Sequence, residues 1–238
     1  MIRLPVERSR IGERLTLTPQ ERHYLVTVLR LSPGDALEVF DGEGGRHLAT
    51  LADLETLALG PRSAQLPRRE VVLAQGLAKG DKVELVVQKA TELGASAIAP
   101  FSSERAVVKL EGARAVERVA RWQKIAAEAA RQCNRATVPE VRPIASLEEV
   151  VARAVKEGAA PLLLWEEERL LKLSAAVARH AGPLLLIVGP EGGLSREEVA
   201  RAVSAGAQTV TLGSRVLRTE TVALAALAVV EFLEGELG

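Results

Sequence analysis

The pattern of hydrophobic and polar positions changes near residue 69. Before that point, short apolar segments alternate with turn residues, which is typical of a small β-rich domain. We predict strands at 15–17, 37–40 and 47–51, and a helix over 19–31, where apolar residues recur at helical spacing. The polar, proline-marked stretch 60–69 is predicted to be a linker.

From Val71 onward, continuous apolar runs alternate with amphipathic segments. This succession predicts an α/β domain in which helices cover both faces of a mainly parallel sheet. The predicted domains are therefore 1–68 and 69–238. The expected strands are 71–77, 97–100, 162–165, 184–188 and 209–212, and the expected helices are 81–93, 114–135, two that begin after the capping boxes Ser146/Glu149 and Ser195/Glu198, and 219–233.

Composition narrows the class of protein. The chain has 238 residues, of which 47% are hydrophobic, and its 31 basic and 31 acidic residues give zero net charge. A folded protein is expected, without strong indiscriminate binding to nucleic acid. One cysteine, Cys133, and three histidines argue against a disulfide or a zinc site, so no metal is expected. No apolar run reaches membrane-spanning length and the start has no apolar signal segment, so we expect a cytoplasmic protein without membrane attachment.

Glycines follow the predicted strand 184–188 directly. The loop Gly189-Pro-Glu-Gly-Gly193 connects this strand to the helix that begins after Ser195. Ligands of open α/β sheets lie at the carboxyl ends of strands, and glycines let the backbone approach a flat ligand closely. The alternative is a tight strand-to-helix turn with no ligand. Neither a Walker motif nor a dinucleotide fingerprint is present.

The predicted strand 209–212 is also followed by a glycine and a polar loop that leads into a helix. The segment 212–221, Leu-Gly-Ser-Arg-Val-Leu-Arg-Thr-Glu-Thr, places Arg215, Arg218 and Glu220 between a strand and the last helix. By itself this loop is compatible with a solvated surface. Together with the first loop and the strand end at 163–165, it predicts one partly apolar pocket.

These two loops resemble the SPOUT-class methyltransferases, and specifically the RsmE family. The resemblance extends along the whole chain. It includes His23, Val28-Leu-Arg-Leu31, Gly34-Asp35, Gln88-Lys89, Glu92-Leu-Gly94, Ser103-Glu-Arg105 and Ala130-Arg-Gln132.

The resemblance implies a fold, a cofactor and a substrate. The C-terminal domain would be a SPOUT α/β trefoil-knot domain, and the N-terminal one a small PUA-like β-barrel that binds RNA. The implied reaction is methylation of N3 of one uridine in 16S rRNA of the small ribosomal subunit, with S-adenosylmethionine as methyl donor, by a homodimer. The implied donor-binding residues are Leu163, Leu164, Trp165, Glu166, Val188, Gly189, Pro190, Glu191, Gly192, Gly193, Leu212, Gly213, Ser214, Val216, Leu217 and Arg218.

Methylation of uracil N3 requires removal of its proton or stabilisation of the resulting anion. Glu220 is the candidate base, and Arg218 the candidate for stabilising negative charge on a uracil carbonyl oxygen. Glu220 has an alternative role, in which it pairs with an arginine or interacts with the N-terminus of the last helix.

Basic residues recur along the predicted helix 114–135 on the side opposite its apolar face. They indicate either an RNA-binding surface or a solvated face with ion pairs to Glu117 and Glu128. The predicted RNA-binding residues are Arg22, His23, Arg30, Lys89, Arg105, Arg131 and Arg135. Two rival functions remain at this point: a SPOUT enzyme that acts on ribose 2′-hydroxyls or on tRNA, and a non-catalytic assembly factor.

Overall fold

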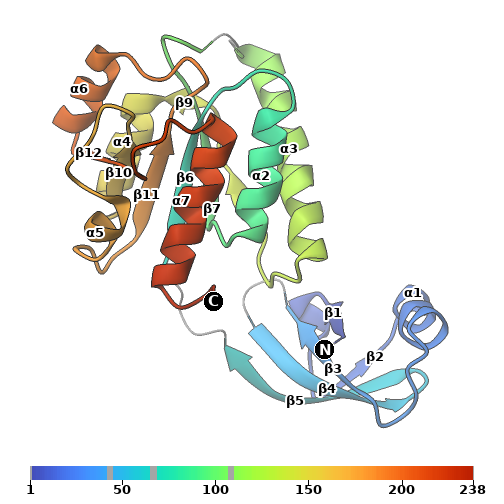
Figure 1. The fold of residues 1–238 in the computed structure, drawn as a ribbon. Coiled ribbons are helices and arrows are strands. Elements are labelled where there is room, and N and C mark those ends of the chain that lie inside the picture. Colours follow the sequence, from blue (N-terminus) through green and yellow to red (C-terminus); the bar gives the residue numbers. More distant parts are fainter. Residues whose placement is uncertain (1, 42–44, 65–68, 107–109, 238) are drawn as a thin grey trace. The chain divides into compact units, whose positions relative to one another are not determined.

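The computed structural model describes residues 2–41, 45–64, 69–106 and 110–237. The chain divides into two compact units (Figure 1). Unit 1 comprises residues 1–68 and 134–138, and unit 2 comprises residues 69–133 and 139–238. Each unit is described separately below.

Unit 1 is a five-stranded sheet that curls around a small core. In the order β1-β3-β4-β5-β2, β1 runs parallel to β3 and the other neighbours are antiparallel. Alternate residues of β3 and β4 point inward, and Leu37, Val39 and Leu51 are fully buried. The strands are β1 (Arg3–Pro5), β2 (Arg14–Thr16), β3 (Ala36–Phe40), β4 (Gly45–Asp53) and β5 (Thr56–Ala64).

The three strands expected in this unit are confirmed, but the predicted linker is wrong over part of its length. Residues 60–64 continue β5, where Gly45 is paired with Ala64. Proline at position 61 is compatible with this strand because β2 pairs only with residues 56–58 of β5. The Leu59 N–H still donates to the Glu13 carbonyl oxygen, but beyond it no described strand pairs with β5 on that side, so the missing N–H of Pro61 breaks no ladder.

The predicted helix 19–31 forms in part. Helix α1 (Pro19–Arg22) begins with a capping box between Thr18 and Glu21, and it continues into the wider π-turns of η2 (His23–Val28). Only Leu25 is buried in η2. The segment ends before Arg30, whose φ of 57° lies in the left-handed region and cannot continue a helix.

Unit 2 contains a seven-stranded sheet in which every pairing is parallel, with the order β12-β10-β11-β6-β7-β8 and β9 also on β7. All five residues of β11 and all six of β6 are buried, as expected for strands covered on both faces. The strands are β6 (Val71–Gly76), β7 (Ala97–Ser102), β8 (Glu140–Val141), β9 (Ala145–Ser146), β10 (Ala160–Leu164), β11 (Leu184–Val188) and β12 (Gln208–Val210).

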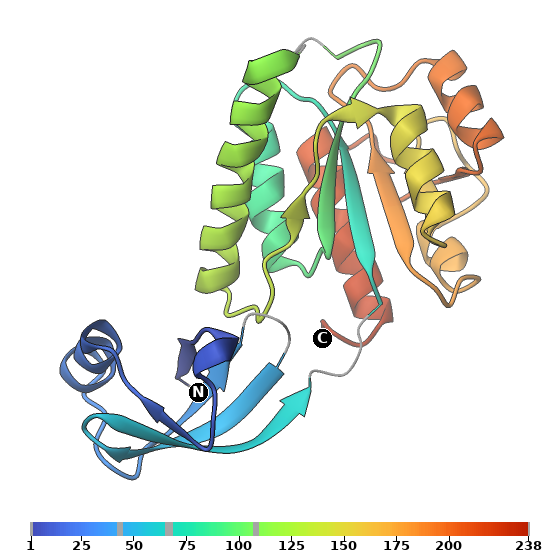
Figure 2. The ribbon, with the colours of Figure 1, turned by 180° about the vertical axis from the view of Figure 1, so that it is seen from behind.

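Helices cover both faces of this sheet (Figures 1 and 2). Side chains from α2, α3, α5 and α7 form the core on one face, and those from α4 and α6 form the core on the other. Both predicted capping boxes in this unit are confirmed. Ser146 and Glu149 form one at the start of α4, and Ser195 and Glu198 form the other at the start of α6. The helices are α2 (Lys82–Glu92), α3 (Gly112–Gln132), α4 (Leu147–Lys156), α5 (Leu173–Val177), α6 (Arg196–Ser204) and α7 (Thr219–Leu233).

The carboxyl ends of four strands lie side by side. Val210, Leu164, Val188 and Gln75 are direct partners across β12, β10, β11 and β6. After β12, at the edge of the sheet, the chain returns to place α7 against β11, β6 and α2. This return places Thr219, at the start of α7, beside Gly189 in the loop after β11.

Candidate functional site

The three loops that follow β10, β11 and β12 enclose a cavity of about 460 Å³, which is within the usual size range of ligand pockets. A smaller cavity of about 90 Å³ adjoins it and shares the residues 164–166, 216, 217 and 222. The residues that line the larger cavity come from Lys82 and from three separate segments, 164–166, 188–194 and 216–222. The register of the strand ends places these loops together.

Most of the predicted donor-binding residues line these two cavities. Fourteen do so: Leu164, Trp165, Glu166, Val188, Gly189, Pro190, Glu191, Gly192, Gly193, Leu212, Gly213, Val216, Leu217 and Arg218. Leu163 does not, because alternation along β10 directs it into the core, where it is fully buried. Ser214 lines a separate depression beside Lys172 and Gly213. Lys82, Leu194, Thr219 and Val222 also line the larger cavity, and sequence reasoning did not find them.

A buried hydrogen-bond chain fixes the loop after β11. The Thr219 hydroxyl donates to the Gly189 carbonyl oxygen at 2.6 Å, and it accepts a hydrogen bond from Gln75 Nε2 at 2.9 Å. Gln75 is fully buried at the end of β6. These hydrogen bonds connect three segments that are far apart in the sequence and fix the position of Gly189 in the cavity wall.

Glycine is required at two positions of the cavity wall. Gly193 has a φ of 67° and Gly213 a φ of 131°, which side-chain-bearing residues rarely adopt. A Cβ on Gly193 would also lie 3.0 Å from Glu166 Oε1. Glycine is therefore needed at both positions for the backbone conformation, and at Gly193 also for the close contact with Glu166. A tight strand-to-helix turn with no ligand, the alternative stated above, does not account for the cavity that these glycines line.

Glu191 ties this loop to the start of α2. Its Oε1 accepts hydrogen bonds from the Lys79 N–H and from Lys82 Nζ, both at 2.9 Å. Lys82 lines the cavity at the same time. The ion pair with Glu191 holds the Lys82 ammonium group at the cavity, and the Glu191 carboxylate largely balances its positive charge.

Glu168 organises the loop after β10. Its carboxylate accepts hydrogen bonds from Thr209 Oγ1 at 2.6 Å and from the Leu170 N–H at 2.8 Å. These bonds and those from the neighbouring N–H groups of Leu171 and Arg169 lower the pKa of Glu168 to about 2.

Because its pKa is lowered in the folded state, ionised Glu168 stabilises the fold above its ordinary pKa, and this contribution is lost as the pH falls from about 4.5 toward about 2. Glu168→Gln is expected to lower the melting temperature at pH 7 by about 2–4 °C, and the difference from the wild type should shrink below pH 4. Thermal melts across this range measure the effect, with Glu197→Gln as a control, since Glu197 is exposed and outside the loop. A difference in melting temperature between Glu168→Gln and the wild type that stays the same at all pH values would contradict the stabilising role of ionised Glu168.

The two predicted catalytic residues are placed differently. Arg218 is exposed and lines the larger cavity, immediately before α7. Glu220 is half-buried in the first turn of α7 and is not a lining residue of either cavity. Its Oε2 is buried without a hydrogen-bond partner within the described residues, so the predicted alternative, a pair with an arginine, is not observed.

The predicted RNA-binding residues are divided between the units. Arg22, His23, Arg30 and Arg135 belong to unit 1, and Lys89, Arg105 and Arg131 belong to unit 2. Several are already in ion pairs: Arg22 with Glu55 at 3.4 Å, Lys89 with Glu92 at 2.9 Å and Arg131 with Glu128 at 2.6 Å. Arg105 is exposed and makes no ion pair with any described residue.

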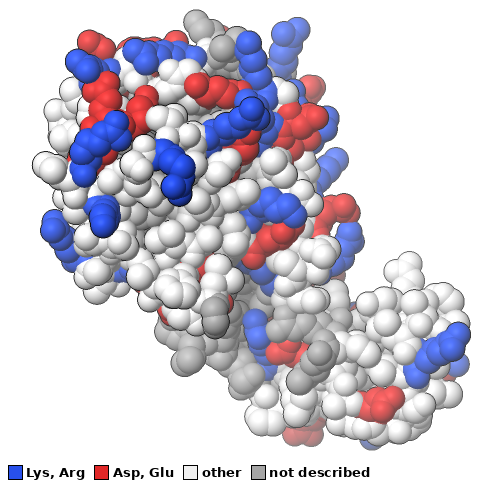
Figure 3. Space-filling model, viewed as in Figure 1, with Lys and Arg blue, Asp and Glu red and all other residues white. Residues whose placement is uncertain are grey.

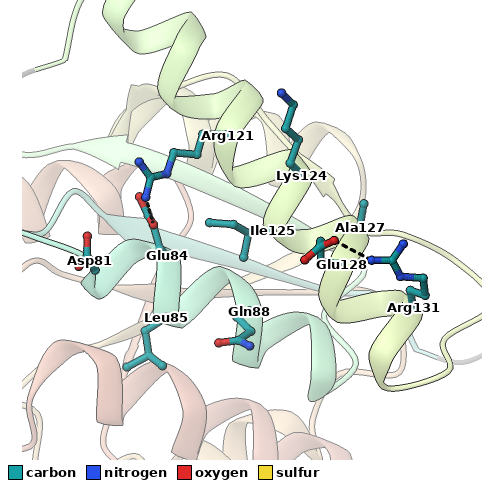
Figure 4. Close-up of a pocket in the computed structure, with 10 residues that line it drawn as sticks. All are labelled: Asp81, Glu84, Leu85, Gln88, Arg121, Lys124, Ile125, Ala127, Glu128 and Arg131. Atoms are coloured by element: carbon teal, nitrogen blue, oxygen red, sulfur yellow. Dashed lines mark hydrogen bonds and ion pairs between the residues drawn. The ribbon is translucent and has the colours of Figure 1, made fainter.

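A larger depression, of about 930 Å³, lies between α2 and α3 (Figure 4). Glu84 of α2 pairs with Arg118 at 3.0 Å and with Arg121 at 2.8 Å, while Glu128 pairs with Arg131. The predicted basic face of α3 is thus partly neutralised by a carboxylate from α2, which the sequence of α3 alone does not reveal. Figure 3 shows basic and acidic side chains interspersed along this side. No strand end or glycine loop reaches this depression.

Two negative observations apply to the described part of the chain. No helix there is both long and apolar enough to cross a membrane. Within the same residues, no three His, Cys, Asp or Glu side chains come together in a way that could hold a metal ion.

Comparison with known proteins decides the family. An RNA methyltransferase domain family matches residues 64–231, and an RNA methyltransferase PUA domain matches residues 17–57. Ribosomal RNA small subunit methyltransferase E from Bacillus subtilis is 34% identical over 91% of this chain and 89% of its own length. The chain belongs to the ribosomal RNA small subunit methyltransferase E family.

Two further relatives agree. The methyltransferase E from Mycobacterium bovis is 38% identical over 90% of this chain and 84% of its own length. The crystal structure of the Neisseria gonorrhoeae enzyme, bound to S-adenosylmethionine, is 34% identical, covers 98% of both chains and superposes with a TM-score of 0.78. The family resemblance and the fold class inferred from the sequence, a SPOUT α/β domain with a PUA-like domain, are confirmed.

Proposed function

We propose that this protein transfers a methyl group from S-adenosylmethionine to N3 of one uridine in 16S rRNA of the small ribosomal subunit. One observation carries the proposal. Loops from three neighbouring strand ends line a single cavity in a chain whose relatives are named as small-subunit rRNA methyltransferases. In the proposed division of labour, residues 69–238 form the catalytic domain and residues 1–68 bind RNA.

The cavity fits the methyl donor. Its walls combine glycine-rich backbone and apolar side chains with a few charged ones, Lys82, Glu166, Glu191 and Arg218. The related structure from Neisseria gonorrhoeae holds S-adenosylmethionine. When bound, this cofactor supplies an electrophilic methyl group for an in-line displacement, so the protein must chiefly orient the acceptor and prepare its N3.

Two residues near the cavity suit that preparation. Arg218 at the rim carries donors that can bind a uracil carbonyl oxygen as negative charge develops on the ring. Glu220 lies two residues further along, and the unpartnered oxygen of its carboxylate is suited to accept the N3 proton. Its position outside the cavity lining means that it would act from the edge of the site.

Glu220→Gln is expected to lower turnover roughly a hundredfold, because an amide cannot accept the N3 proton. Donor affinity should be nearly unchanged, and the folded state should be at least as stable, because the substitution removes the negative charge from a carboxylate with a buried, unpartnered oxygen. Calorimetric titration, thermal melts and single-turnover rates separate these effects. Unchanged turnover would remove Glu220 from the mechanism.

The activity itself is tested by labelled methyl transfer to small ribosomal subunits that lack the modification, followed by nucleoside analysis. N3-methyluridine is the expected product. Primer extension discriminates the rival reaction, because an N3-methyl group blocks base pairing and stops reverse transcriptase, whereas a ribose 2′-O-methyl group does so only at low nucleotide concentration. Absence of donor binding would instead favour a non-catalytic assembly factor.

We also propose that the enzyme is a cytoplasmic homodimer that needs no metal. Large apolar side chains of the cavity loops are exposed in the single chain, among them Leu170 at 92% and Val216 at 81%. Such exposure beside a site is typical of a surface that another molecule covers. Light scattering of the purified protein gives the oligomeric state, and the ribosomal substrate favours the cytoplasm.

A further inference from the structure

Glu198 joins two segments that lie far apart in the sequence. It is buried in the first turn of α6, with only 3% of its surface exposed. Its Oε2 accepts a hydrogen bond from the Ser195 N–H, and its Oε1 accepts one from the Glu104 N–H, both at 2.9 Å. A capping box uses only the first of these bonds. The second one anchors the turn 103–106 that follows β7.

The same turn is held from the outside. Glu104 Oε2 accepts a hydrogen bond from the Ser195 hydroxyl at 2.8 Å, and its Oε1 accepts one from Arg201 at 2.8 Å. Arg201 also donates to Glu148 of α4 at 2.6 Å. The bonds from Arg201 and Ser195 lower the pKa of Glu104, which keeps the carboxylate ionised. Both oxygens of Glu104 and of Glu198 are thus engaged.

This anchored turn lies directly on the donor loop. A Cβ built on Gly192 would be 2.9 Å from the carbonyl oxygen of Arg105 and 3.2 Å from its Cβ. Gly192 lines the cavity, so the side chain of Arg105 starts at the edge of the donor site. Arg105 is exposed and has no ion pair within the described residues, in contrast to Lys89 and Arg131. A guanidinium group that has no ion pair within the described residues, on a side chain that begins beside Gly192, is suited to bind a phosphate of the RNA acceptor.

We propose that Glu198 is a positioning residue that acts through the Glu104 backbone to hold Arg105 at the donor loop, where Arg105 binds an RNA phosphate. The proposal rests on the function proposed above. Because Glu198 uses both carboxylate oxygens as acceptors, Glu198→Gln leaves one of the two N–H groups facing an amide NH2 group. The turn 103–106 then loses its fixed place relative to Gly192.

The test measures binding of small ribosomal subunits that lack the methyl group, over a range of salt concentrations. Glu198→Gln and Arg105→Ala are each expected to weaken binding roughly tenfold, as for loss of one hydrogen bond to a charged group. Each should also reduce the slope of log affinity against log salt by about 1. Glu197→Gln, the same change at the exposed neighbouring position, should alter neither quantity.

The double variant distinguishes positioning from a purely structural role. If Glu198 acts through Arg105, Glu198→Gln should add no further loss in the Arg105→Ala background. Additive losses, or an unchanged salt slope in Glu198→Gln, would overturn the proposal. Should Glu198→Gln fail to fold, Arg201→Ala loosens the same turn from the protein surface and is expected to give the same slope change.

Donor affinity and nucleoside analysis of the wild type keep the two hypotheses apart. The proposed reaction fails if the wild type transfers no methyl group to N3 of uridine. The positioning proposal depends on RNA affinity and its salt slope alone, and it fails if these do not respond as stated.

Discussion

Replacing Gly76 with alanine is expected to weaken S-adenosylmethionine binding roughly tenfold to a hundredfold. Gly76 is the last residue of β6, and a Cβ built on it lies 2.6 Å from both N and Cδ of Pro190 and 3.0 Å from the carbonyl carbon of Gly189. These are atoms of the donor loop backbone, which cannot move aside without changing the cavity wall. Overpacking of this kind costs about 1–3 kcal/mol, and here the loop must move or the site must open.

Calorimetric titration with S-adenosylmethionine measures this effect. The matched control is Gly182→Ala, since a Cβ there meets only the Gly158 carbonyl oxygen at an ordinary 3.7 Å and no positive φ opposes it. The control should bind the donor as the wild type does. If Gly76→Ala also kept full affinity, the close contact between β6 and the donor loop would not matter for binding.

Sequence reasoning found the parts of the site that local rules encode. A glycine after a buried strand, a Ser-x-x-Glu capping box and an apolar run are each visible within about ten residues. The strand ends and the boundaries of α7 follow from such signals, whereas the sixteen donor-binding residues were implied by the family resemblance, and fourteen of them line the two cavities. Leu163 packs into the core and does not line the cavities, because alternation along β10 directs its side chain inward.

The remaining features depend on contacts between distant segments. Thr219 and Gln75 are 144 residues apart, and Glu198 and Glu104 are 94 apart, so neither pair has a local signature. Likewise Lys82 reaches the site only because α2 begins beside the loop after β11. The predicted linker 60–69 failed for a related reason. Gly60-Pro61 is typical of a break in structure, yet it is compatible with β5 because that part of the strand has no second neighbour.

Arg218→Ala is expected to lower methyl transfer roughly a hundredfold to a thousandfold, the usual cost of removing a donor that stabilises developing charge. Arg218 is exposed at the rim of the donor cavity and makes no ion pair with any described residue. It also precedes α7, whose free N–H groups give its N-terminus a partial positive charge. A uracil that loses its N3 proton carries negative charge on both flanking carbonyl oxygens, and Arg218 places a positive charge at the cavity where that negative charge would develop.

The decisive measurement compares single-turnover rates with donor affinity in the same variant. Arg218 is one of sixteen residues that line the larger cavity, so affinity for S-adenosylmethionine should change by less than about tenfold. Arg218→Lys should recover part of the rate, because an ammonium group keeps the charge but lacks the planar pair of donors. Arg179→Ala, an exposed arginine of the same unit outside both cavities, should leave both quantities unchanged. A loss of donor affinity as large as the loss of rate would place Arg218 in cofactor binding, because only an interaction that strengthens in the transition state lowers the rate of the bound complex.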